Sequence, residues 1–106
     1  MTAAVQQQLT AISEPNRFRI VELLRDGPRS VTGIVDALGL AQPQVSRHLR
    51  LLAEAGVVEA TRQAQSRIYR LVPGPMRDLS DWALGFAVIW SDRMDRLGSI
   101  LDDTNE

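Results

Sequence analysis

The stretch that decides the fold reads Ala41-Gln42-Pro43-Gln44-Val45-Ser46-Arg47-His48-Leu49-Arg50. At about 100° per residue, Val45, Leu49 and Leu52 share one narrow stripe, whereas Arg47 and Arg50 point the other way. This spacing predicts a short helix with an apolar back that packs on a core and a polar front that stays free. A front whose only cations are arginines is suited to reading DNA.

A strand–turn–strand pattern follows this helix. Ala55-Gly56-Val57-Val58 leads into a strand-like run through Arg62, the polar tip is Gln63-Ala64-Gln65-Ser66, and a second run covers Arg67-Ile68-Tyr69-Arg70-Leu71. Two such runs joined by a short polar tip predict a β-hairpin. A helix that leads into a basic hairpin is the winged-helix arrangement.

Helices separated by clear breaks fill most of the remaining chain. Residues 3–12 predict a first helix, which ends at Ser13-Glu14-Pro15, where a capping residue followed by proline starts the next helix. That second helix carries Phe18, Val21 and Leu24 on an apolar stripe that Ile20 and Leu23 widen, and Asp26-Gly27-Pro28 ends it.

A third, shorter helix precedes the stretch quoted above. Ser30 can cap it, its apolar residues lie between Val31 and Leu38, and Gly39 is suited to its C-terminal end. After the hairpin, Pro73-Gly74-Pro75 predicts a break, and residues 76–102 predict one long helix. The sequence therefore indicates a mainly α fold with a small β-hairpin, a winged helix-turn-helix with a long C-terminal helix.

Length and composition exclude several classes of protein. The 106 residues predict one domain, 1–106, and the absence of cysteine excludes disulfides and thiolate metal sites. The longest apolar run, Trp82–Trp90, is about half of a membrane-spanning helix. Residues 1–8 lack the basic start and apolar segment of a secretory signal, so we expect a cytoplasmic protein with no membrane partner.

The net charge of −1 conceals a division along the chain. Residues 14–72 hold nine arginines against six acidic residues, whereas residues 73–106 hold three arginines against seven acidic residues. A basic body of this kind can present a local positive surface to phosphates although the whole chain is close to neutral.

Four segments together resemble the ArsR/SmtB family of bacterial winged-helix repressors. They are Glu14-Pro15-Asn16-Arg17 with Ile20-Val21-Glu22-Leu23-Leu24, Gln42-Pro43-Gln44-Val45-Ser46-Arg47-His48-Leu49, Ala55-Gly56-Val57-Val58, and Tyr69-Arg70-Leu71. The resemblance covers residues 9–72 closely and the tail more loosely. It implies a homodimer that represses a promoter by binding a partly palindromic operator in double-stranded DNA, with helix 42–54 in the major groove and the wing, 57–71, on the backbone or minor groove.

Two positions depart from the family pattern. Ala41 stands where relatives commonly have Ser or Thr, so an N-cap worth about 1 kcal/mol is missing from the reading helix. Gly33 stands where relatives often have an acidic residue, which removes half of a capping box and adds roughly 1 kcal/mol of helix cost. We therefore expect weaker DNA binding and a softer helix 31–38.

Seven polar residues are the candidate DNA contacts: Gln42, Gln44, Ser46, Arg47, Arg50, Arg62 and Arg67. The glutamines can bond adenine edges and Arg47 can bond guanine, whereas the other arginines suit phosphates. An exposed polar helix face needs no ligand, however, and Ser46 can return to a backbone carbonyl. Arg70 can equally pair with Glu59, and we expect His48, the only histidine, to be structural.

Metal binding and catalysis find little support in the sequence. The thiolate positions of the resembling arsenic sensors align with Ser30, Thr32 and Val35, which bind no soft metal, and residues 76–106 contain no histidine. Four carboxylates form pairs three residues apart that could attract a hard cation: Asp78, Asp81, Asp92 and Asp95. Such a helix face is more often solvated, and no nucleophile or Gly-rich loop lies near it. We therefore predict no metal, no cofactor and no enzymatic activity.

The terminal helix is apolar around most of its circumference, so one face needs a partner. Its dimerisation stripe recurs at three- to four-residue spacing or its multiples, with Arg93 and Met94 in the gap, and comprises Leu79, Trp82, Phe86, Trp90, Leu97 and Leu101. The same stripe can instead fold over its own domain, and the aromatic residues could also border a small-molecule effector site.

Three hypotheses follow, of which a dimeric operator-binding repressor explains most features. A winged-helix protein-interaction module with little DNA affinity would fit Ala41, the uncharged wing tip and the acidic tail. A hard-metal-responsive regulator would use Asp81 and Asp92. The sequence leaves the operator, the target genes and any effector open.

Overall fold

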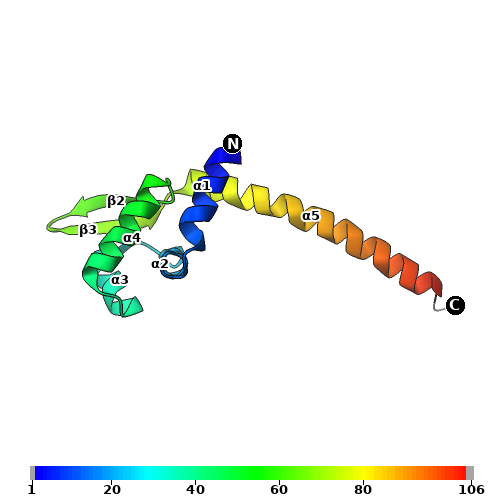
Figure 1. The fold of residues 1–106 in the computed structure, drawn as a ribbon, viewed down its shortest axis with the longest axis horizontal. Helices are drawn as coiled ribbons and strands as arrows, with labels where there is room; N and C mark the ends of the chain where they lie inside the picture. Colours follow the sequence, from blue (N-terminus) through cyan, green and yellow to red (C-terminus); the bar gives the residue numbers. More distant parts are fainter. Residues whose placement is uncertain (1, 105–106) are drawn as a thin grey trace.

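The computed structural model describes the backbone of residues 2–104 and the side chains of residues 3–98. The elements follow the order α1 (Thr2–Ser13), α2 (Pro15–Arg25), β1 (Arg29–Ser30), α3 (Val31–Leu38), α4 (Gln42–Glu54), β2 (Val58–Gln63), β3 (Ser66–Leu71) and α5 (Pro73–Thr104). Figure 1 shows α3, α4 and the hairpin at one end of the molecule and α5 leaving the other. The predicted fold class, mainly helical with a small β-sheet, is confirmed.

Side chains cap the first helix turns as the sequence indicates. The Glu14 carboxylate accepts a hydrogen bond from the backbone N–H of Arg17 at 2.8 Å, with Pro15 in the first position of α2. The Ser30 Oγ accepts from the N–H of Gly33 at 3.0 Å. α3 ends at Gly39, whose φ of 69° lies in the left-handed region that favours glycine. Each of these helix ends is therefore fixed by residues near it in sequence.

Helix α4 begins without a side-chain cap from Ala41, as predicted. Half of a capping box remains, because Gln44 Oε1 accepts a hydrogen bond from the Ala41 N–H at 3.2 Å. The helix ends at Glu54, and Gly56, with a φ of 79°, turns the chain into β2.

The sheet has three antiparallel strands in the order β1-β3-β2. The hairpin register runs from Val58 opposite Leu71 to Gln63 opposite Ser66. The sequence missed β1, which pairs Arg29 with Tyr69. Two residues are too few to show a strand periodicity, so only the pairing with β3 makes this segment a strand.

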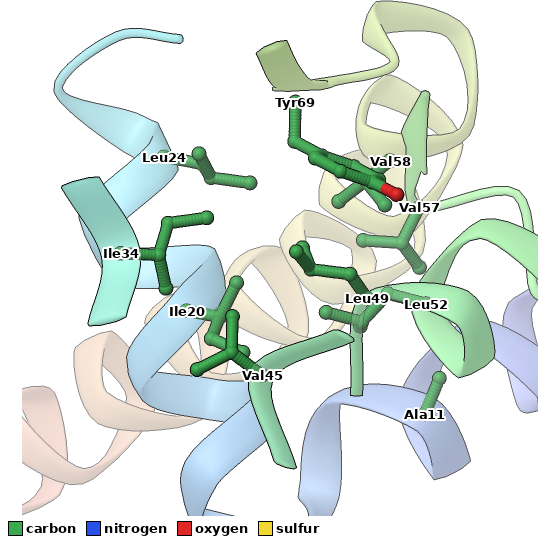
Figure 2. Close-up of a cluster of buried hydrophobic side chains, with 10 residues drawn as sticks. All are labelled: Ala11, Ile20, Leu24, Ile34, Val45, Leu49, Leu52, Val57, Val58 and Tyr69. Atoms are coloured by element: carbon green, nitrogen blue, oxygen red, sulfur yellow. The ribbon is translucent and has the colours of Figure 1, made fainter. Parts of the chain in front are cut away.

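The core joins α4 to the other helices and the hairpin. Figure 2 shows apolar side chains that converge between these elements: Ala11, Ile20, Leu24, Ile34, Val45, Leu49, Leu52, Val57, Val58 and Tyr69. Val45, Leu49 and Leu52 are fully buried, which is the stripe that the sequence predicts for the back of α4. Because the back of α4 is fixed in the core, its polar front faces outward.

One predicted core residue lies elsewhere. Phe18 is 49% exposed, although the sequence places it on the apolar stripe of α2. The buried residues of α2 are Ile20 and Leu24, and Phe18 lies about 160° around the helix from Ile20. The assignment was wrong because several apolar residues of α2 compete for one buried face, and packing against α3 and α4 selects among them.

The predicted break at Pro73-Gly74-Pro75 is also wrong. Helix α5 begins at Pro73, and the N–H of Met76 donates to Val72 O at 3.3 Å. Both prolines occupy the first turn, where the missing N–H groups would have no partner inside the helix.

Helix α5 packs against α1 at its start and then extends away from the body, which gives the molecule a long axis of 69 Å (Figure 1). None of the helices in residues 2–104 combines the length and apolar character needed to span a bilayer.

Candidate DNA-binding surface

A groove of about 910 Å³ lies between α4 and the β2–β3 hairpin. Six of the seven predicted contact residues line it: Gln42, Ser46, Arg47, Arg50, Arg62 and Arg67. The first four come from the exposed front of α4, and the last two come from the hairpin. Residues that are up to 25 positions apart in the sequence therefore share one concave surface.

The groove is strongly basic. Its arginines are Arg47, Arg50, Arg62 and Arg67, and no acidic residue is among the residues that line it. All four side chains are exposed, so water and a ligand can reach them. Several like charges in one concave surface raise the local potential and attract phosphates.

The hairpin arginines divide into two kinds. Arg70 donates from Nε to Glu59 Oε1 at 2.7 Å, and its Nη2 contacts the same oxygen, so the predicted Arg70–Glu59 pair is confirmed. Arg62 and Arg67 lie directly opposite each other in the strand register and have no ion-pair partner among the described residues. Like charges at directly opposed positions destabilise a hairpin. The wing therefore carries a repulsion that an anion would relieve.

Gln44 is the predicted contact that does not line the groove. Its Oε1 accepts the hydrogen bond from the Ala41 N–H, so the acceptor half of the amide is engaged. Bonding to adenine needs both halves of the amide. In this conformation Gln44 helps to begin α4, a role that the missing cap at Ala41 makes necessary.

The sequence missed several polar residues that also line the groove: Ser30, Thr32, Thr61, Gln65 and Ser66. The start of α3 reaches the groove because α3 packs against α4. Thr32 is exposed there, whereas the Ser30 hydroxyl is already engaged in capping. The only sequence signal was a polar residue two positions after the capping serine, and this does not separate a contact from an ordinary surface residue.

His48 lies at the rear of α4, as expected for a structural histidine, with a side chain that is 16% exposed. Its Nδ1 lies 3.5 Å from Arg17 Nη1 and 3.7 Å from Glu14 Oε2. Burial raises the pKa of Glu14, but hydrogen bonds from the N–H groups of Arg17 and Asn16 and the nearby positive charges outweigh it. The pKa of this carboxyl is therefore below its ordinary value.

The predicted dimerisation stripe is largely solvent-exposed in the single chain. Trp82, Phe86, Trp90 and Leu97 are 42–59% exposed, and Leu79 is half-buried. The Trp82 and Phe86 rings meet edge to face at 4.9 Å. The side chain of Leu101 lies outside the described residues. Large apolar side chains exposed in such number are typical of an interaction surface.

Neither the alternative of a hard-metal site nor an effector site beside the aromatic residues gains support. Within the described chain, no three acidic or histidine side chains come together in a group that could hold a metal ion. A second hollow, of about 560 Å³, lies between α1 and α4. Neither this hollow nor the basic groove is lined by Trp82, Phe86 or Trp90, so a small-molecule site beside these residues stays a prediction.

Comparison with known proteins gives consistent matches. Residues 14–60 match the family model described as "bacterial regulatory protein, arsR family". The regulator NmtR of Mycobacterium tuberculosis is 37% identical over 82 residues, which are 77% of this chain and 68% of NmtR. The repressor SmtB of the same species is 44% identical over 68 residues, 64% of this chain but only 50% of SmtB.

Comparison with solved structures finds the same fold in a related domain. The homodimeric winged helix-turn-helix DNA-binding domain Mb0332 of Mycobacterium bovis superposes with a TM-score of 0.66 at 26% identity. The match covers 86% of this chain and 82% of that domain.

Proposed function

Since this chain belongs to the ArsR family, whose members are DNA-binding transcription regulators rather than enzymes, we propose that it is a homodimeric repressor that binds a partly palindromic operator. The observation that carries the proposal is the groove between α4 and the hairpin, with four exposed arginines and no acidic lining residue. A surface of this charge and shape fits the backbone of double-stranded DNA.

Each element has a distinct role in this proposal. Helix α4 enters the major groove, where Arg47 bonds guanine and Gln42 and Ser46 contact base edges or phosphates. Arg50 contacts phosphate, and Arg62 and Arg67 hold the hairpin on the backbone or in the minor groove. Gln44 supports the start of α4 and reads no base through its acceptor.

Dimerisation takes place through α5. Its exposed aromatic side chains need a partner, and the similar Mb0332 domain is homodimeric. Two copies related by a twofold axis would present two α4 helices to half-sites one helical turn apart, which makes the operator partly palindromic. Bound over a promoter, such a dimer would exclude the transcription machinery, in keeping with the repressor SmtB among its relatives.

A fluorescence-anisotropy titration tests the DNA-binding function. The protein is titrated against a duplex from the region upstream of its own gene and against a scrambled duplex, each over a salt series. We expect a Kd for the upstream duplex that is lower by about 10³-fold or more, with a steep salt dependence.

Equal, weak binding to both duplexes would count against an operator at this position, and a random duplex pool would then test for any preferred sequence. If that pool also yields no preferred sequence, the repressor proposal is wrong and a protein-interaction module is favoured. Sedimentation equilibrium tests the dimer separately.

A further inference from the structure

His48 Nδ1 lies between two side chains of opposite charge at the rear of the reading helix. Arg17 Nη1 approaches this nitrogen to 3.5 Å, and Glu14 Oε2 lies 3.7 Å from it. Glu14 is the N-cap residue of α2 and Arg17 lies in its first turn, whereas His48 belongs to α4. One ring nitrogen therefore faces a donor and an acceptor on a neighbouring helix.

The proton on Nδ1 decides which contact is attractive. An unprotonated Nδ1 accepts a hydrogen bond from the Arg17 guanidinium and offers nothing to a carboxylate. A protonated Nδ1 donates to Glu14 and is repelled by Arg17. The two contacts therefore exclude each other. In the neutral ring, Arg17 favours the tautomer with its proton on Nε2, which leaves Nδ1 as the acceptor, whereas the protonated ring can only donate from Nδ1 to Glu14.

The two partners are attached to different parts of the fold. Arg17 Nε donates to the carbonyl oxygen of Ala11 in α1, so a histidine held by Arg17 links α4 to α1. Glu14 Oε2 accepts from the Arg17 N–H and caps α2, so a histidine bonded to Glu14 links α4 to the N-terminal end of α2 instead. Exchange of partner changes which helix holds the rear of α4.

We propose that His48 is a positioning residue of the DNA-reading helix, and that its protonation transfers α4 from Arg17 and α1 to Glu14 and thereby lowers DNA affinity. This role rests on the DNA-binding function proposed above. In the structure Nδ1 lies slightly nearer to Arg17 Nη1, at 3.5 Å, than to Glu14 Oε2, at 3.7 Å, which is the order expected for an unprotonated Nδ1 that joins α4 through Arg17 to α1. Protonation removes the link to α1 and moves the front of α4 relative to the hairpin.

Among the side chains around His48, the histidine is the one expected to change its charge between pH 5 and 8. The charged groups that face His48 are Glu14, which caps α2, and Arg17 in the first turn of α2. Helix α1 carries no charged side chain, and Arg47 on α4 itself lines the groove. Since the pKa of Glu14 is lowered, this carboxylate stays ionised while a histidine titrates. His48 is the only histidine in the chain, and no other type of side chain ordinarily changes charge between pH 5 and 8.

DNA binding between pH 5.5 and 8.0 at constant ionic strength tests the proposal, with wild type beside His48→Gln. Glutamine can accept from Arg17 and donate to Glu14 but cannot titrate in this range. We expect the wild-type affinity to fall by about threefold or more toward pH 5.5, and the variant affinity to stay constant. A flat wild-type profile, or the same slope in His48→Gln, would overturn the proposal.

A second measurement needs no DNA. Amide chemical shifts of the full chain are followed by NMR over the same pH range. If the link through Arg17 exists, the last turn of α1, around Ala11, shifts together with α4 in wild type and stays unchanged in His48→Gln. A response confined to α4 would show that the histidine is only a local packing residue. Loss of DNA binding at every pH would instead count against the proposed function, and the NMR result would still decide the role of His48.

Discussion

Substitution of Arg67 by Gln separates the DNA-binding role of the wing from its stability. Arg67 lines the basic groove, has no ion-pair partner among the described residues and lies directly opposite Arg62. Removal of one of two opposed like charges should stabilise the hairpin, by up to about 1 kcal/mol. The same change removes a phosphate contact and should weaken DNA binding. For Arg67→Gln we therefore expect the free energy of unfolding to rise and the affinity for DNA to fall.

The size of the affinity loss follows from counterion release. Each phosphate contact contributes about 0.9 to the slope of log K against log salt, so a dimer that loses two contacts should lose about 1.8 from its slope. At 0.1 M salt, each contact increases the affinity about 8-fold relative to 1 M, so the loss should be about 60-fold for the dimer. The loss should be the same for the upstream and the scrambled duplex, since phosphate contacts carry no sequence information.

Arg70→Gln provides the matched control on the same strand. Arg70 is paired with Glu59 and does not line the groove, so its substitution should leave the salt slope unchanged and should not stabilise the fold. Anisotropy titrations over a salt series and urea unfolding measure both quantities for each variant. An Arg67→Gln slope equal to that of wild type, or equal losses of affinity in the two variants, would refute the assignment of the wing as a phosphate-binding element.

Four further predictions concern other parts of the molecule. Arg47→Ala should cost about 1–3 kcal/mol per half-site for the operator but much less for a scrambled duplex, and equal losses for both would contradict base reading. Ala64→Gly should raise the free energy of unfolding by roughly 1 kcal/mol in urea, because Ala64 has a φ of 57° at the hairpin tip; no rise would argue against backbone strain there. Trp90→Asp should raise the dimer dissociation constant by about tenfold or more in sedimentation equilibrium, whereas Val88→Asp, equally exposed but about 160° around α5, should not. The lowered pKa of Glu14 stabilises the fold above the ordinary glutamate pKa, and this stabilisation is lost as the pH falls through the folded value. Between pH 7 and pH 3, the free energy of unfolding should therefore fall less for Glu14→Gln than for wild type.

The sequence by itself determined the features that depend on neighbouring residues. The apolar stripe of α4, the cap at Ser30, the turn at Gly39 and the hairpin around residues 63–66 all rest on local periodicity or on hydrogen bonds over a few residues. The same local reasoning identified the missing cap at Ala41, because an alanine side chain has no hydrogen-bond acceptor wherever it lies.

Only the tertiary structure decided which of these features meet. Strand β1 exists because β3 pairs with it, and Phe18 is exposed because Ile20 and Leu24 take the buried face of α2. Gln44 is separated from the basic groove by its position around α4, although its residue type matches that of Gln42. The groove itself joins α3, α4 and the hairpin, and its formation depends on core packing between segments far apart in the chain, which no local pattern in the sequence records.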